Sequence, residues 1–252
     1  KLNISTFDEA GIKTSLPVYI NDIEKADEAG KIVGFVPGYD ELENLVQEGY
    51  KLFKANQLED SIQIFRKVIY IIATLSLNSN DEEEKCKEIM NICKEYILAL
   101  QIELTRRALP ATEVKRNLEL AAYFSHMKLQ PAHRLNALQV AMTQSFKAKN
   151  YHYASYFASE FLKIMSTGSR AEQAKKIQAK ADSIATDAIV IDYDPFADWE
   201  ICAGDYVPIY GNDIVREKVL GVGYGKSWKG KICKVTQISE IGGVGSGLRL
   251  KN

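Results

Sequence analysis

The sequence predicts a mainly α-helical fold, in which irregular helical hairpins form a solenoid-like domain between an N-terminal β-hairpin arm and a small C-terminal β-rich subdomain. Three observations lead to this prediction. Apolar residues recur at helical spacing through the central part of the chain, short β-prone runs precede it, and closely spaced glycines follow it. We accordingly divide the chain into residues 1–39, 40–187 and 188–252.

The first segment, residues 1–39, contains two short β-prone runs and no helical periodicity. The runs are Leu16–Ile20 and Lys31–Val36, and the polar residues 21–30 separate them. We therefore expect an arm that forms a hairpin with a long solvated loop. Because a two-stranded ribbon alone is marginally stable in water, its apolar residues need a surface to lie on, which is either the body of this chain or a partner.

The central segment predicts helical hairpins without a regular repeat. Gly49 and Phe65 fall near the spacing of a tetratricopeptide unit, with a small residue where two helices cross. Over residues 118–161 alanines alternate with large aromatic residues, which lets helix axes approach closely and predicts the packed core. The expected helices are 40–56, 58–77, 81–109, 111–128, 131–149, 151–166 and 170–186.

From Ala188 onward the pattern changes to short apolar runs between turn residues. Residues 188–193 alternate towards a period of two, which is typical of a strand. Further strands are expected at Tyr206–Tyr210, Lys231–Ile238 and Leu248–Leu250. A unit this small is expected to rest on the helical body.

The composition is that of an ordinary globular protein, with 252 residues, 46% hydrophobic and 26% charged. A formal net charge of −1 gives no overall electrostatic case for nucleic acid or an anionic membrane. The longest apolar run, Val68–Leu77, is too short to span a bilayer. Because the chain begins at Lys1 rather than methionine, we expect it to be a piece of a longer protein.

The cysteine pattern argues against a disulfide framework and fits a reducing, cytosolic setting. Cys86 and Cys93 are seven apart on one expected helix and are interpreted as core residues. Cys202 and Cys233 lie in the glycine-rich segment, where a metal site would need histidines from the helical segment. We expect no catalytic residue, cofactor or metal, and keep a metal- or thiol-dependent enzyme using the β-rich unit as the alternative. The histidines are His126, His133 and His152, of which His126 is interpreted as structural.

The glycine-rich segment also contains two weak signals for phosphate. Gly221–Ser227 has the look of a P-loop, but Leu220 stands where the first glycine is required. A short basic run beside Trp228 is expected to be a solvated strand face, with contact to phosphate as the alternative. The run consists of Lys226, Lys229, Lys231 and Lys234.

Several stretches resemble the C-terminal region of coatomer alpha subunits, in matching order over about residues 40–252. They are Leu120–His126, Leu129–His133, Ile201–Tyr210, Gly230–Gly242 and, in its helical-hairpin setting, Asn56–Phe65. The family often carries extra cysteines where this chain has Val219–Val222, which further weakens the zinc hypothesis.

The resemblance implies a structural scaffold domain of the COPI vesicle coat, and no enzyme. It implies retrograde Golgi-to-ER and intra-Golgi transport, a cytoplasmic location, and peripheral attachment to Golgi membranes and COPI-coated vesicles. Its implied partners are the coatomer epsilon subunit, a tetratricopeptide-type solenoid that would form a heterodimer with it, and other coatomer subunits. No nucleic acid and no transmembrane segment is expected.

Since a solenoid partner has a concave groove, we expect the arm to protrude into the groove of the epsilon subunit. The rival docking surfaces are the helical face of 118–161 and the β-rich unit. The residues predicted to bind the partner are Leu16, Val18, Tyr19, Ile20, Ile32, Val33, Phe35 and Val36.

Overall fold

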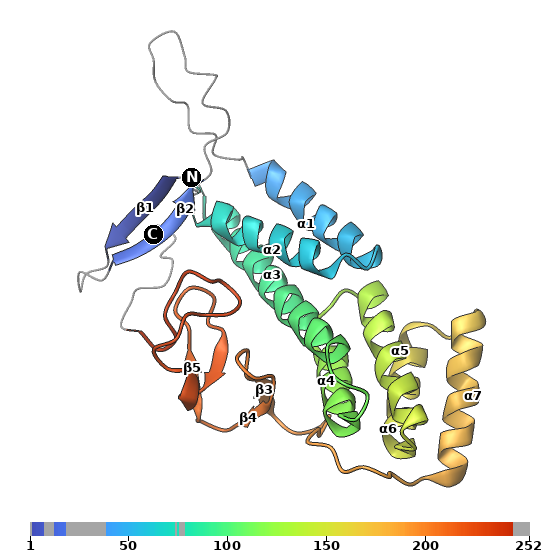
Figure 1. Ribbon diagram of the computed structural model, residues 1–252. Coiled ribbons are helices and arrows are strands. Elements are labelled where there is room, and N and C mark those ends of the chain that lie inside the picture. The colour runs from blue at the N-terminus through green and yellow to red at the C-terminus, as the bar shows by residue number, and fades with distance from the viewer. Residues whose placement is uncertain (1, 8–12, 19–38, 74, 76–78, 244–252) are drawn as a thin grey trace, which may run out of the picture. The chain divides into compact units, whose positions relative to one another are not determined.

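The computed structural model describes residues 2–7, 13–18, 39–73, 75 and 79–243 (Figure 1). The chain divides into two compact units, one made of Lys1–Ile97 with Cys202–Asn252 and the other of Leu98–Ile201. The limit at residue 98 falls inside a single helix, α3 (Asn80–Arg107). The limits of these two units differ from those of the three segments expected from the sequence. The division into three domains stays a prediction.

The fold is mainly α-helical, as predicted, and all seven expected helices are present with limits shifted by a few residues at most of their ends. Besides α3 they are α1 (Tyr39–Lys54), α2 (Leu58–Ile72), α4 (Val114–His126), α5 (Pro131–Lys147), α6 (Tyr151–Ile164) and α7 (Ser169–Ile184).

In the first unit, α1 and α2 form a helical hairpin that crosses at Gly49. A β-carbon at this glycine would lie 2.7 Å from the ring of Phe65, so only glycine allows the two helices this approach. The hydroxyl of Ser61 donates to the carbonyl of Gly49 at 2.8 Å and closes the same crossing. The ring centroids of Phe65 and of Tyr96 on α3 lie 4.9 Å apart, so that Tyr96 completes the aromatic core. The predicted small residue at a helix crossing is confirmed.

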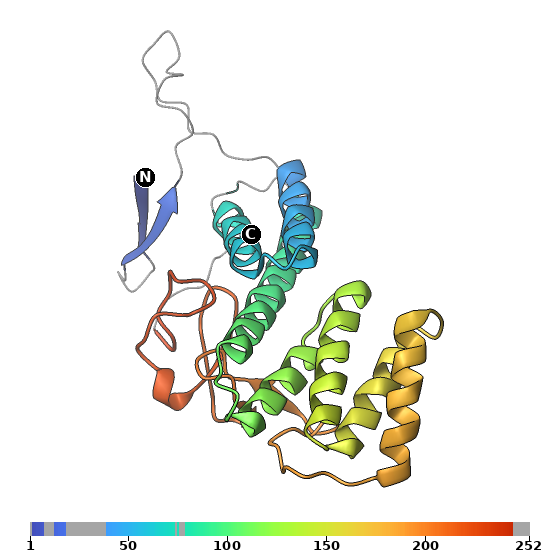
Figure 2. The same cartoon turned by 45° about the vertical axis from the view of Figure 1, so that its right-hand side comes forward.

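In the second unit, α4, α5, α6 and α7 pack in chain order, and Figure 2 shows α5, α6 and α7 side by side. Ala154 and Ala158 on α6 are completely buried, which brings the helix axes close together. The last helix, α7, buries only the alanines Ala171, Ala174 and Ala181, and most of its other residues are polar. A polar outer helix is what ends a solenoid-type stack in water.

The described part of the arm is an antiparallel hairpin, but its strands differ from those expected. Strand β1 (Leu2–Phe7) pairs with β2 (Lys13–Val18), so that Ile4 stands opposite Leu16 and Leu2 opposite Val18. The run at 2–7 was not predicted as a strand, and the expected partner strand at 31–36 lies outside the described residues.

The C-terminal strands are short. They are β3 (Trp199–Ile201) in the second unit and β4 (Pro208–Tyr210), β5 (Ile214–Arg216) and β6 (Gly223–Gly225) in the first, the last followed by a turn of 3₁₀ helix at Lys226–Trp228. Strand β5 pairs antiparallel with β6. The expected strand at 206–210 is confirmed in β4, whereas that at 248–250 lies outside the described residues.

The prediction of a strand at 231–238 is wrong. In this stretch only Ile232 makes an isolated bridge, to Glu240. The chain turns instead, because the amide of Gln237 donates to the carbonyl of Cys233 at 2.9 Å and Gln237 has a left-handed φ of 59°.

Side chains of α2 bond the carbonyls that a neighbouring strand would have paired. The buried Arg66 donates from Nη2 to the carbonyl of Lys234 at 2.9 Å and from Nε to that of Val235 at 3.0 Å. The hydroxyl of Tyr70 donates to the carbonyl of Thr236 at 2.7 Å. Helix α2 therefore replaces a sheet as the hydrogen-bonding partner of this loop.

The prediction of a strand at 188–193 is also wrong, and for a similar reason. The fully buried Asn150 bonds both backbone groups of Ile189, donating to its carbonyl at 2.7 Å and accepting from its amide at 2.9 Å. The hydroxyl of Tyr123 donates to the carbonyl of Asp192 at 2.6 Å. These side chains hold the segment against the helices without a strand beside it.

Candidate interaction surfaces

The structure describes two of the eight residues predicted to bind the partner. Leu16 and Val18 lie in β2, opposite Ile4 and Leu2 of β1. The other six, Tyr19, Ile20, Ile32, Val33, Phe35 and Val36, lie outside the described residues. Their role in binding stays a prediction.

The cysteines of the glycine-rich segment are buried among hydrogen bonds. Cys202 Sγ accepts from the amide of Gly225 at 3.3 Å, and Cys233 Sγ accepts from the hydroxyl of Tyr224 at 3.2 Å. Burial raises the pKa of the Cys202 thiol, and a hydrogen bond to Asp205 raises it further, so the reactive thiolate is disfavoured. Among the described residues no group of three His, Cys, Asp or Glu side chains gathers as metal ligands. No observation therefore favours the alternative of a metal- or thiol-dependent enzyme.

The basic run surrounds Trp228. Lys231 Nζ lies 4.3 Å and Lys234 Nζ 4.5 Å from the centre of the indole ring, which are cation–π distances. The indole packs on Gly204, where a β-carbon would lie 2.1 Å from it. Lys226 pairs with the exposed carboxylate of Asp213. The lysines therefore lie on a turn and a 3₁₀ helix, and the prediction that they form a strand face is wrong.

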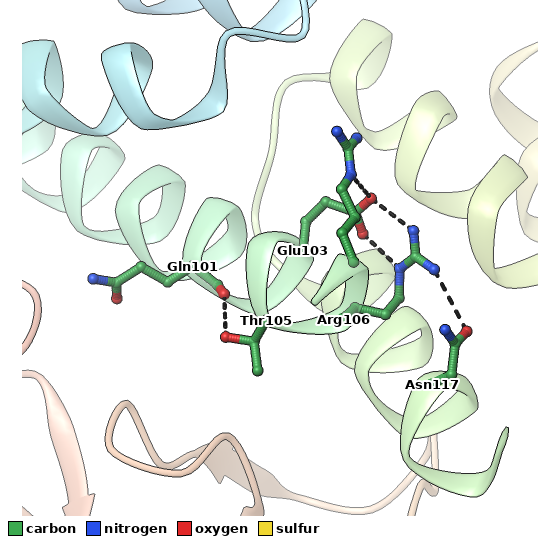
Figure 3. Close-up of polar contacts among 6 residues, drawn as sticks. Gln101, Glu103, Thr105, Arg106 and Asn117 are labelled. Carbon is green, nitrogen blue, oxygen red and sulfur yellow. Dashed lines mark hydrogen bonds and ion pairs between the residues drawn. The ribbon is translucent and has the colours of Figure 1, made fainter. Parts of the chain in front are cut away.

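A buried charge lies in the part of α3 that belongs to the second unit. The carboxylate of Glu103, whose side chain is 2% exposed, accepts two hydrogen bonds from Arg106, at 2.7 and 2.8 Å, and one from Arg107 at 2.7 Å. Figure 3 shows this cluster, with Arg106 also reaching the carboxamide oxygen of Asn117 at 3.5 Å. Two guanidinium groups around one carboxylate compensate its desolvation, and we interpret the cluster as structural.

A pocket of about 270 Å³ opens between the end of α4, α5, α6 and the segment that follows α7. Its lining includes His126, Arg134, Tyr156 and Tyr193. Sequence reasoning missed this site, because its residues come from segments far apart in the chain. The one signal for it was the Asp-Pro dipeptide at 194–195, which indicates a turn next to Tyr193.

His126 packs against an aromatic side chain. Its ring stacks on the indole of Trp199 with 4.4 Å between centroids. Desolvation lowers the pKa of His126, and the positive charges of Arg134 and Lys128 lower it further. The lowered pKa favours the neutral form of the imidazole.

Among the described helices, none is both long and apolar enough to cross a membrane. The family model that describes the C-terminus of the coatomer (COPI) alpha subunit matches residues 19–252, which is nearly the whole chain. The chain belongs to this family.

Individual relatives agree with the family match. The chain is 47% identical over 234 residues to coatomer subunit alpha of Saccharomyces cerevisiae, with 92% of this chain and 20% of that protein covered. It is 36% identical over 212 residues to coatomer subunit alpha-2 of Arabidopsis thaliana (83% and 17% covered) and 34% identical over 217 residues to coatomer subunit alpha of Dictyostelium discoideum (83% and 18%). The chain thus spans about a fifth of the length of the curated relatives it matches.

Membership in the coatomer alpha family makes the chain part of a COPI coat component, and confirms the resemblance found in the sequence. The relatives are named as alpha subunits of coatomer.

Proposed function

We propose that this chain is a scaffold domain of the COPI coat that binds the coatomer epsilon subunit through its N-terminal arm. The complex would be a heterodimer that joins other coatomer subunits and serves retrograde Golgi-to-ER and intra-Golgi vesicle transport. Its site of action would be the cytoplasmic face of Golgi membranes and COPI-coated vesicles, where it is attached peripherally. Membership in the coatomer alpha family supports this proposal.

The observation that carries the proposal is the hairpin of β1 and β2. Alternate residues of a strand fall on the same face of the ribbon, so the register places Leu2, Ile4, Leu16 and Val18 on one face. An isolated two-stranded ribbon with an apolar face is marginally stable in water and gains stability when that face is covered. A concave groove of a tetratricopeptide-type solenoid has the shape to surround such a ribbon.

We assign the main binding energy to apolar residues of the arm. Leu16 and Val18 belong to β2, and Tyr19 directly follows it in the chain. Aromatic residues dominate many protein interfaces, and truncation of Tyr19 or Phe35 to alanine is expected to cost on the order of 2 kcal/mol of binding free energy. The remaining predicted contacts are Ile20, Ile32, Val33 and Val36.

Deletion of the arm in two steps tests the proposal. One variant lacks residues 2–18, the described hairpin, and another lacks residues 19–36. Both are compared with the intact chain for capture of purified epsilon subunit. The proposal predicts that removal of either part greatly reduces capture. Undiminished capture by both variants would contradict it and would favour the helical face of 118–161 or the β-rich unit.

A surface variant of the second unit serves as the matched control. Val190 is 86% exposed in that unit and lies outside the arm. Val190→Ser removes an exposed apolar side chain and is expected to leave capture of the epsilon subunit unchanged.

A further inference from the structure

The pocket between α4, α5 and α6 combines buried hydroxyl groups with positive charge. It holds about 270 Å³, which is slightly below the usual range for small-molecule and cofactor sites but sufficient for one side chain. We call it the cationic pocket. Its lining residues that matter here are Ser125, Lys128, Arg134, Tyr156, Glu160 and Tyr193.

The inner end of the cationic pocket is lined by hydroxyl groups. Tyr193 is 5% exposed, and its hydroxyl is hydrogen-bonded to the side chains of Ser125 and Tyr156. The hydroxyl of Tyr153 donates to the carbonyl of Tyr193 at 2.8 Å and fixes its backbone. Burial raises the pKa of Tyr193, so its hydroxyl stays protonated and donates its one proton to the hydroxyl of Tyr156. The hydroxyl of Tyr156 can then donate its own proton to a ligand.

Arg134 supplies most of the donors at the pocket. Among the contacts of the described residues, its guanidinium makes one hydrogen bond, from Nη2 to the carboxylate of Glu160 at 3.2 Å. A guanidinium carries five N–H donors, so several remain available to a ligand. The Arg134 side chain is 40% exposed, which leaves it accessible from solvent.

The charge balance of the pocket is positive. Lys128 and Arg134 are the cations of its lining, and Glu160 is the anion. The carboxylate of Glu160 is shared between Arg134 and Lys163, which lies outside the lining. Among the charged residues of the lining, the cations therefore outnumber the anion.

We propose that the cationic pocket binds the phosphate group of a phosphorylated side chain on a partner polypeptide. A guanidinium fork and hydroxyl donors match the geometry of phosphate oxygens, and arginine is the side chain best suited to bind them in pairs. The segment beside the pocket favours a polypeptide over a free anion. Pro195 lines the pocket, and the neighbouring Phe196 exposes its ring for contact with residues that flank the phosphate.

The proposal does not depend on binding of the epsilon subunit. It can be tested on the whole 252-residue chain by NMR titration with three probes. The probes are a blocked phosphoserine tripeptide flanked by phenylalanine, its unphosphorylated twin, and inorganic phosphate. We expect saturable shifts at residues 125–138 with the phosphorylated peptide, much weaker shifts with inorganic phosphate, and none with the unphosphorylated twin.

Variants sharpen the test. Arg134→Gln is expected to weaken binding about tenfold or more, since a hydrogen bond to a charged group is lost. Glu160→Gln removes the one negative charge of the lining and is expected to strengthen binding several-fold. Phe196→Ser is expected to weaken binding of the phosphorylated peptide and to leave binding of inorganic phosphate unchanged. The matched control is Lys180→Gln, which removes a positive charge from the exposed face of α7 and should leave binding unchanged.

The amide spectrum outside the pocket shows whether each variant is folded. Absence of saturable shifts in the intact chain would overturn the proposal. If Lys180→Gln weakened binding of the phosphorylated peptide as much as Arg134→Gln does, the binding would depend on net charge alone. That result would also overturn the proposal. Equal affinity for the peptide and for inorganic phosphate would overturn the assignment to a partner polypeptide.

Discussion

The guanidinium of Arg66 donates from Nε to the carbonyl oxygen of Val235 across 3.0 Å, and so joins α2 to a loop that lies 169 residues further along the chain. Its Nη2 bonds the preceding carbonyl, that of Lys234. Burial lowers the pKa of Arg66, but a guanidinium stays charged at any ordinary pH. One buried side chain therefore holds the end of the β-rich segment against the α1–α2 hairpin.

Replacement of Arg66 by methionine removes this link. Arg66→Met leaves two carbonyls without their donor, and we expect a loss of about 2–4 kcal/mol in the free energy of unfolding, measured by urea denaturation. Tyr70→Phe removes one hydrogen bond of the same loop, to the carbonyl of Thr236, and should cost about 1 kcal/mol. A methionine variant as stable as the intact chain would contradict the assigned role.

The crossing of α1 and α2 predicts an unusual response at Gly49. Glycine to alanine in a helix ordinarily stabilises by up to about 1 kcal/mol. Here the added β-carbon would lie 2.7 Å from the ring of Phe65, and we expect a net destabilisation of about 1–3 kcal/mol. In a Phe65→Leu background the same substitution should cost less, because the smaller side chain makes room. An equal cost in both backgrounds would show that the ring is not the cause.

The buried Glu103 offers a test of the charge cluster on α3. Glu103→Gln leaves Arg106 and Arg107 without their carboxylate, and we expect a loss of about 3–5 kcal/mol in the free energy of unfolding. Glu172→Gln is the matched control, since Glu172 forms an exposed pair with Lys175. The control should leave the unfolding midpoint in urea unchanged, and a similar effect of both substitutions would contradict our interpretation.

His126 predicts a pH dependence of stability. Its pKa is lowered in the folded chain, by desolvation and then by the positive charges of Arg134 and Lys128, while the unfolded chain keeps the ordinary value near 6.5. The unfolded state therefore binds the proton more readily. The contribution of the neutral imidazole to stability is fully present above the ordinary pKa and is lost as the pH falls below it.

Thermal unfolding of the intact chain and of His126→Gln between pH 7.5 and 5 measures this effect. The intact chain should lose more stability than the variant over that range. Parallel curves would show that another group is responsible.

The helices could be predicted from the sequence because their apolar periodicity records which face is buried. Gly49 is a clear case, since its spacing from Phe65 indicated the crossing that the structure contains. The small residues Ala154 and Ala158 likewise indicated close packing, and both are completely buried.

The two strand predictions that proved wrong show the limit of reasoning from apolar periodicity. Residues 188–193 alternate because Ile191 and Tyr193 are buried and their neighbours are exposed, as in a strand. What the alternation cannot tell is which group bonds the backbone. In this segment the side chain that bonds the backbone is that of Asn150, and in 231–238 it is that of Arg66. Both residues are far away in sequence from the backbone groups that they bond. The cationic pocket was missed for the same reason.

The central claim is that the arm, rather than the helical body, binds the epsilon subunit. Hydrogen exchange of the whole chain, with and without purified epsilon subunit, tests it most directly. The account predicts slowed exchange in residues 2–36 on binding and unchanged exchange in residues 118–161. Slowed exchange confined to residues 118–161 or 202–243, with the arm unaffected, would contradict it.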